Sequence, residues 1–185
     1  MKLPIVAYGD PVLRKVCVSI DETYPDLDKL ISNMFETMYS ASGVGLAAPQ
    51  IGLPIRLFIV DTGADEEEKS YKKVFINAKI VEETGEPWAF TEGCLSIPDI
   101  REDVMRKPNI RIQYYDENWQ FHEDEITGMP ARVVQHEYDH IEGKLFTDTL
   151  GLLRKRMLKS KLDAISRGDV HADYKMKFPQ QRKKR

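Results

Sequence analysis

Two histidines four positions apart, His136 and His140, constrain the fold of this chain more than any other feature of its sequence. Residues at i and i+4 lie on one face of a helix, so both imidazoles can reach a single ion. The neighbouring Ala131, Val133 and Val134 indicate that this helix packs into the core. Polar side chains that enter a core need partners, and a metal ion would supply them. We therefore expect a fold built around a metal-bearing helix.

The residue after the first histidine is Glu137, which can handle a proton at an open metal position. A catalytic site of this kind needs a third ligand. The extended metzincin pattern would place a histidine at position 146, where this chain has Phe146. A thermolysin-like site would need a glutamate well downstream, and no glutamate follows Glu142. Neither protease pattern is therefore complete.

The segment 91–98 offers another ligand, because it places Cys94 among small and turn-forming residues. Mixed cysteine and histidine sites bind a divalent ion tetrahedrally and leave one position to water. A soft thiolate favours Fe²⁺, Co²⁺, Ni²⁺ or Zn²⁺ over Mg²⁺ or Ca²⁺. The second cysteine, Cys17, is interpreted as a small buried hydrophobe, since two cysteines make no disulfide framework in a chain of 185 residues.

Hydrophobic periodicity predicts helices and strands along the whole chain. Helices are expected over 27–39, about 130–141 and about 150–166. Strands are expected over 56–60 and 73–81, with a hairpin over 110–115 and 119–126. The stretch 43–52, rich in glycine and proline, is expected to be a shaped loop, and 61–70 an acidic exposed loop.

Strands followed by helices, without regular βαβ alternation, favour an α+β fold. The expected architecture has antiparallel or mixed sheets around the central helix that carries the two histidines, with one helix nearer each end of the chain. Its length fits one domain, which we place at 1–168.

Charge divides the chain into an acidic body and a basic end. Residues 150–185 hold 12 Lys/Arg and 3 Asp, a net of +9, whereas residues 1–149 hold 15 Lys/Arg and 27 Asp/Glu, a net of −12. We expect 169–185 to be a basic tail whose distal part is mobile. No stretch approaches the ~20 apolar residues of a membrane span. The N-terminus does not resemble a signal peptide, so the cytoplasm is the expected location.

Three segments resemble, in order, the signature motifs of bacterial-type peptide deformylases. They are Gly-Val-Gly-Leu-Ala-Ala-Pro-Gln at 43–50, Glu-Gly-Cys-Leu-Ser at 92–96 and His-Glu-Tyr-Asp-His at 136–140. The resemblance extends over about residues 4–165. It implies a hydrolase that removes the formyl group from the N-terminal formyl-methionine of new polypeptides and releases formate.

The resemblance implies the following roles for individual residues. One divalent metal ion, Fe²⁺ in cells with Zn²⁺, Ni²⁺ or Co²⁺ also accepted, is held by Cys94, His136 and His140. Glu137 is the general base and then the general acid. The side chain of Gln50 and the backbone N–H of Leu95 meet the oxyanion, and the backbone of Gly45 aligns the substrate as an added strand.

The resemblance also implies an apolar pocket for the methionine side chain. Its lining would comprise Val44, Phe90, Met129, Val133 and the ring of His136. Glu92 and Arg101 match a pair that bonds together near the substrate pocket in the family. Arg132 stands where other members often carry an aliphatic residue, and it could face solvent with its stem over apolar surface. Asp139 receives no role.

Two other functions are weighed against this one. The first is an ordinary metalloprotease that uses the same histidines to cleave internal peptide bonds. The second is a ribosome- or RNA-associated protein with a structural metal, which would need a fourth protein ligand, and His122 and His171 lack ligand spacing. In a deformylase the basic C-terminal segment could still contact ribosomal RNA, because counterion release favours cationic segments on a polyanion.

Overall fold

The computed structural model describes residues 1–63 and 71–180. Part of the expected acidic loop (64–70) and the distal end of the expected tail (181–185) therefore lie outside the described residues. Within these ranges the fold is α+β, as predicted, with two antiparallel sheets, one parallel pair of short strands and three α-helices. None of the helices in the described ranges is both long and apolar enough to cross a membrane.

The main sheet has five strands in the order β2-β3-β4-β7-β8, and every neighbouring pair is antiparallel. Two strands and the hairpin were expected at these places, whereas β2 falls in the stretch predicted to be a loop. The strands are β2 Gly45–Ala47, β3 Leu57–Asp61, β4 Lys72–Thr84, β7 Asn109–Tyr115 and β8 Phe121–Thr127. β2 is an edge strand, and a short 3₁₀ turn, η2 Ala48–Ile51, follows it.

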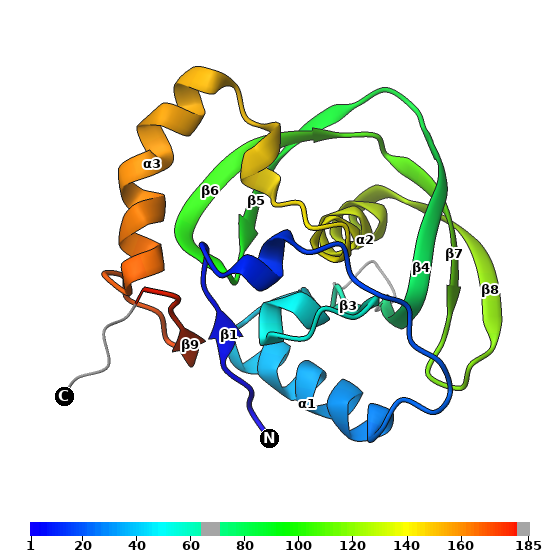
Figure 1. Cartoon of the computed structure of the whole chain (residues 1–185). Helices are drawn as coiled ribbons and strands as arrows, with labels where there is room; N and C mark the ends of the chain where they lie inside the picture. The colour runs from blue at the N-terminus through cyan, green and yellow to red at the C-terminus, as the bar shows by residue number, and fades with distance from the viewer. Residues whose placement is uncertain (64–70, 181–185) are drawn as a thin grey trace.

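A second sheet is the hairpin of β5, Trp88–Cys94, and β6, Ile97–Arg106, which the sequence analysis did not predict. Leu95 and Ser96 form the turn that joins them. Figure 1 shows this hairpin curving over one side of α2, Gly128–Ile141, with β4, β7 and β8 on another side. The helix with the two histidines is thus central, as predicted.

Three hydrophobic clusters hold these layers together. Ala131 and Val134 of α2 pack with Phe58, Phe75 and Tyr114 of the main sheet. The helix α1, Leu27–Ser40, covers the β2–β3 end of the sheet with side chains at helical spacing. The third cluster joins the β5–β6 hairpin to η3, Phe146–Thr149, and to α3, Leu152–Arg167.

The chain beyond α3 returns to the domain. After Gly168 it turns back, and β9, Met176–Lys177, pairs in parallel with β1, Ile5–Val6. Figure 1 shows the two strands side by side near the N-terminus. The first part of the segment expected to form the basic tail therefore contacts the domain through β9, and the end that was expected to be mobile lies outside the described residues.

Candidate metal centre

The helix α2 presents His136 and His140 on one face. Their ring centroids are 5.1 Å apart, and the rings stand edge to face. The helix can end soon after the second histidine because Gly143 adopts a left-handed φ of +70°. Only glycine fits there, since an added Cβ would lie 2.7 Å from the carbonyl oxygen of Arg14. The i, i+4 geometry expected from the sequence is therefore present.

Cys94 stands at the end of β5, where the β5–β6 register shifts between Gly93 and Cys94. Its Sγ lies 3.3 Å from Nε2 of His140, and the ligand atoms of Cys94, His136 and His140 all lie within 4.8 Å of one another. Within 1–63 and 71–180, no other group of three His, Cys, Asp or Glu side chains has metal-site geometry. Neither His122 nor His171 supplies a fourth ligand, since each pairs with an aspartate elsewhere.

The chemistry of these three groups fits a divalent transition metal. His140 is 1% exposed, and burial lowers its pKa well below the usual value, which keeps the imidazole in its ligating, neutral form. Among the described residues its Nδ1 finds no hydrogen-bond partner. Burial also opposes protonation of His136, but hydrogen bonds with Cys94 and Glu92 outweigh burial and raise its pKa. The raised pKa shows that the surroundings of His136 favour a positive charge at this position.

Glu137 lies beside this centre, in contact with β2. A Cβ added to Gly45 would lie 2.4 Å from Oε1 of Glu137, so only glycine leaves room for the carboxyl group. Burial raises the pKa of Glu137 to about 7, and its Oε2 has no hydrogen-bond partner among the described residues. A buried carboxyl group that titrates near neutral pH is suited to proton transfer.

Gln50 reaches the centre from η2. Its Oε1 accepts a hydrogen bond from the backbone N–H of Ala47 at 2.8 Å, which fixes the amide orientation. Its Nε2 then lies 3.4 Å from both Sγ of Cys94 and Oγ of Ser96. The side chain is 1% exposed and presents a neutral donor next to the candidate ligands.

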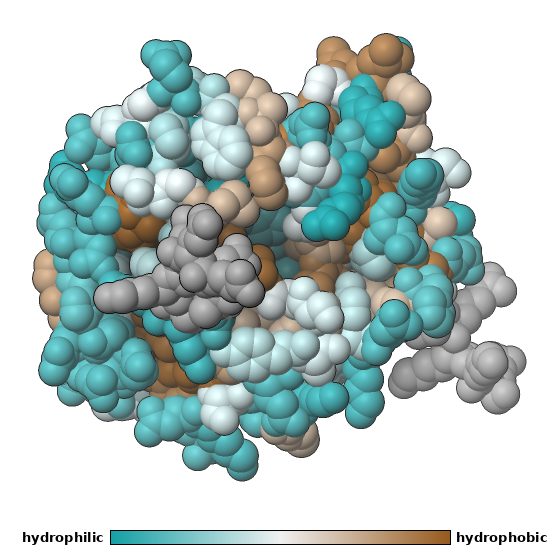
Figure 2. All heavy atoms as spheres, turned by 180° about the vertical axis from the view of Figure 1, so that it is seen from behind, coloured by the Kyte–Doolittle hydropathy of each residue, from teal (hydrophilic) through white to brown (hydrophobic). Residues whose placement is uncertain are grey.

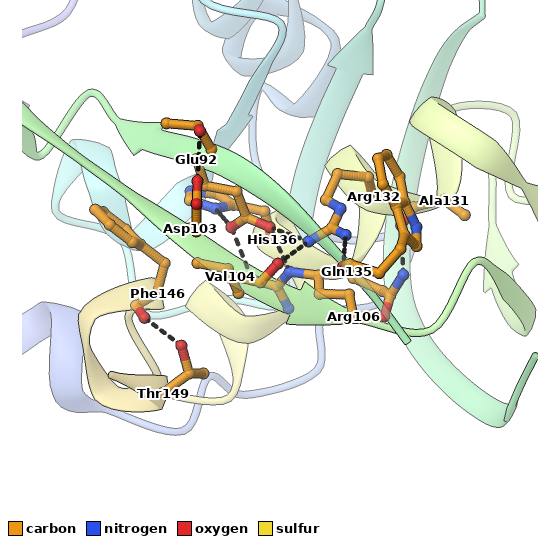
Figure 3. Close-up of polar contacts among 12 residues, drawn as sticks. Glu92, Asp103, Val104, Arg106, Ala131, Arg132, Gln135, His136, Phe146 and Thr149 are labelled. Carbon is orange, nitrogen blue, oxygen red and sulfur yellow. Dashed lines mark hydrogen bonds and ion pairs between the residues drawn. The ribbon is translucent and has the colours of Figure 1, made fainter. Parts of the chain in front are cut away.

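Glu92 holds His136 in place, as Figure 3 shows. One carboxylate oxygen lies 2.9 Å from Nδ1 of His136, and Arg106 and Arg132 bind the same carboxylate at 2.7 and 3.0 Å. Burial alone would raise the pKa of Glu92, but the hydrogen bonds with His136 and Arg106 outweigh it and lower the pKa to about 2. Arg106 also binds Asp139 at 2.8 Å, which gives that residue a structural partner.

The expected bond between Glu92 and Arg101 is wrong. In the β5–β6 register Arg101 lies opposite Gly93, whereas Glu92 lies opposite Glu102. Successive side chains of a strand point to opposite faces, so Glu92 and Arg101 start from opposite faces of the hairpin, although both reach the lining of one pocket. No ion pair between them occurs in the described part of the chain, and Arg106 takes the place expected for Arg101.

Arg132 does not face solvent, which was the alternative considered from the sequence. It is 2% exposed, and its guanidinium lies 4.4 Å from the ring centroid of Trp88. It donates to the backbone oxygens of Trp88 and Val104 at 2.7 and 2.8 Å. Arg132 therefore ties α2 to both strands of the hairpin. No sequence signal pointed to Arg106, because it stands 14 residues from Glu92 in no recognisable motif.

A pocket of about 460 Å³ opens at the candidate centre, with Cys94 and His136 in its lining. Every residue that the sequence indicated for the site lines this pocket except His140. The predicted residues in the lining are Val44, Gly45, Gln50, Phe90, Glu92, Cys94, Leu95, Arg101, Met129, Val133, His136 and Glu137.

Comparison with known proteins agrees with this geometry. The model of the polypeptide deformylase family matches residues 2–156. The peptide deformylase of Christiangramia forsetii is 58% identical over an alignment of 196 positions that covers all of both chains. That of Cytophaga hutchinsonii is 55% identical over 181 positions, covering 97% of this chain and 98% of that one.

Solved structures lead to the same family. A peptide deformylase from Legionella pneumophila superposes with a TM-score of 0.81 at 38% identity, covering 91% of this chain and 98% of that one. The enzyme from Thermotoga maritima gives a TM-score of 0.73 at 38% identity, covering 82% and 99%. With the fold, the sequence and the arrangement of the pocket in agreement, the chain belongs to the polypeptide deformylase family.

Proposed function

We propose that this protein is a metal-dependent hydrolase that removes the formyl group from N-terminal formyl-methionine of newly made polypeptides. The observation that carries the proposal is the convergence of Cys94, His136 and His140 on one point, beside Glu137 and at the pocket. Family membership supports the reaction, and the donor set supports the metal.

Each group near the centre has a proposed task in formyl transfer to water. Bound by the three ligands, a divalent metal would supply a Lewis acid that activates water near neutral pH. Glu137 takes a proton from the attacking water and returns it to the leaving amine. Charge grows on the former carbonyl oxygen, and the Gln50 amide and the Leu95 backbone N–H donate hydrogen bonds to it. The products are formate and a free amino terminus.

Substrate alignment is proposed to use the open edge of β2. An extended peptide can add to a free strand edge through main-chain hydrogen bonds. Gly45 at the start of β2 permits close approach. Val44, Phe90, Met129 and Val133 line the same pocket and give it an apolar wall suited to a methionine side chain.

A formate assay tests the proposal directly. The metal-loaded protein is expected to release formate from formyl-Met peptides and to leave internal peptide bonds intact. Glu137→Ala should lower the rate by about 10²–10⁴ because general acid–base catalysis is lost. If that variant keeps its rate within a factor of two, Glu137 is not the acid–base group. Cleavage of unformylated peptides at internal bonds would instead indicate a protease.

The metal in cells is proposed to be Fe²⁺, with Zn²⁺, Ni²⁺ and Co²⁺ as substitutes. A thiolate with two imidazoles accepts all four ions, so supply and geometry decide among them. Anaerobic purification followed by metal analysis should find iron, and formate release should then fall in air as the ferrous centre oxidises. Zinc in anaerobically purified protein, with a rate insensitive to air, would overturn the iron assignment.

The basic C-terminal part is proposed to contact the ribosome, and the location is proposed to be the cytoplasm, where formylated chains are made in bacteria. Support comes from the exposed Lys155, Arg156 and Lys159 on α3. Figure 2 shows hydrophobic surface where α3 begins at the upper right, and Leu152 and Leu153 are exposed there.

Co-sedimentation with ribosomes should be strong at low salt and steeply lost as salt rises. The triple variant Lys155→Glu, Arg156→Glu, Lys159→Glu should not co-sediment, yet should deformylate free peptides at the parent rate. Unchanged co-sedimentation of this variant would rule out α3 as the contact.

A further inference from the structure

Tyr174 reaches the candidate centre from the C-terminal segment. Its hydroxyl donates a hydrogen bond to the backbone carbonyl of Leu95 at 2.8 Å. Burial raises the pKa of Tyr174 far above its usual value, so the hydroxyl keeps the proton that it donates. Its ring packs in the same cluster as Leu95. This contact fixes one peptide unit of the turn that follows Cys94.

The other carbonyl of that turn is also held from outside the hairpin. The backbone N–H of Tyr8 donates to the carbonyl of Ser96 at 2.8 Å. Tyr8 follows β1 and Tyr174 precedes β9, and these two strands pair through Ile5 N–H to Lys175 O and Ala7 N–H to Lys177 O, each at 2.9 Å. The two ends of the chain therefore brace the Leu95–Ser96 turn together.

The position of this turn matters for the proposed reaction. In a tight turn the N–H of the first central residue takes no part in the closing hydrogen bond, so the Leu95 N–H remains available to a ligand. Oxyanion donors work only when held within about 0.5 Å of the productive geometry. The Ser96 side chain contacts Gln50, and the two terminal segments hold the carbonyl groups of both turn residues.

We propose that Tyr174 is a positioning residue that holds Leu95 so that its backbone N–H points at the oxyanion. The proposal rests on the proposed function, in which Leu95 is one of the two donors. The tyrosine lies beyond residues 2–156, the part of the chain that the family model matches. The segment after α3 thus supports the centre in addition to any docking role of α3.

The test compares Tyr174→Phe with Tyr114→Phe in metal-loaded protein. Phenylalanine keeps the ring and removes only the hydroxyl. Tyr114 is a matched control, since it is buried on β7 and its hydroxyl bonds Asp124 at 2.7 Å outside the pocket. For Tyr174→Phe we expect kcat to fall about tenfold, less than the ~10²–10³ for losing an oxyanion donor, with KM within twofold and one metal per chain. The control should keep the parent kcat.

Hydrogen–deuterium exchange supplies a second readout that does not depend on turnover. The Ser96 amide, which shares a peptide unit with the Leu95 carbonyl, should exchange faster in Tyr174→Phe and at the parent rate in Tyr114→Phe. An unchanged kcat, or a kcat lowered only in proportion to lost metal, overturns the positioning role. If the parent itself releases no formate, the proposed function fails, and unchanged exchange would then separately show that Tyr174 does not hold the turn.

Discussion

Gly45 has no side chain, and the space where one would stand is filled by Glu137. An added Cβ would lie 2.4 Å from Oε1 and 2.8 Å from both Cδ and Cγ of that side chain. Gly45→Ala must therefore displace the whole carboxyl group. We expect formate release to fall by about 100-fold or more, the lower range for losing a general base, with metal content unchanged.

The control for this substitution is Gly151→Ala, because nothing lies within 4 Å of the added Cβ and the backbone has an ordinary φ of −62°. It should keep the parent rate. A fully active Gly45→Ala variant would mean that Glu137 has room to move without loss, and the tight fit would carry no functional meaning.

The two cysteines should differ sharply in reactivity. Cys17 is 5% exposed, and burial raises its pKa to about 11, so almost none of it is thiolate at neutral pH. Cys94 lies at the candidate centre. A thiol reagent should label neither residue in the metal-loaded protein and one per chain after chelation, and Cys94→Ser should abolish that labelling. Equal labelling before and after chelation would show that Cys94 is not a metal ligand.

At the scale of elements, the β5–β6 hairpin depends on buried charges as well as on its ladder. Glu92 connects Arg106 and Arg132 with His136 across the hairpin and α2. Residues that hydrogen-bond to a metal ligand hold it in the right orientation, and their loss typically costs about 10–100-fold in metal affinity. Glu92→Gln should therefore weaken metal binding by about that factor, as measured by competition with a chelator.

Glu102 provides the matched substitution, since it stands directly opposite Glu92 in the same hairpin and binds Arg154 at the surface. Glu102→Gln should leave metal affinity at the parent value, because the Glu102 carboxylate pairs with Arg154, whereas the Glu92 carboxylate pairs with His136. Equal losses in both variants would point to general damage to the hairpin and not to the orientation of His136.

Elements with strong local periodicity were predictable from the sequence. The helices α1 and α2 and the β7–β8 hairpin each carry a repeating apolar pattern that reports burial on one face. The β5–β6 hairpin was missed because most residues of β5 are either exposed or charged and so form no apolar pattern. The strand is held instead by Arg132 from α2, a contact that is distant in sequence. β2 and β9 were missed because two or three residues are too few for a period.

The candidate site divides in the same way. His136, Glu137 and His140 follow from spacing along one helix, which is local information. Cys94 was a candidate from its setting among small and turn-forming residues, whereas Gln50 came only from resemblance to a family. The structure brings both next to that helix. Arg106 and Tyr174 could not be found, because their contacts depend on how distant segments fold against the hairpin.

At the scale of the whole molecule, the candidate centre lies between parts of the chain that belong to two different hydrophobic clusters. Cys94 belongs with the cluster of the hairpin and α3, whereas α2 packs mainly against the five-stranded sheet. A metal bound by Cys94, His136 and His140 would cross-link these two layers. Without the metal, the three hydrophobic clusters and the ion pairs of Glu92 remain. We therefore expect the fold to persist with a lower free energy of unfolding.

Thermal unfolding tests this coupling. A ligand that binds only the folded state at about 100 times its Kd adds about 2.7 kcal/mol. For a chain of this length, 1 kcal/mol shifts Tm by about 2–4 °C, so zinc-loaded protein should melt about 5–10 °C above chelated protein. Cys94→Ala should melt at one temperature with or without chelator, because its layers can no longer be cross-linked. Equal Tm values for loaded and chelated parent protein would show that the ion stabilises no contact between the layers.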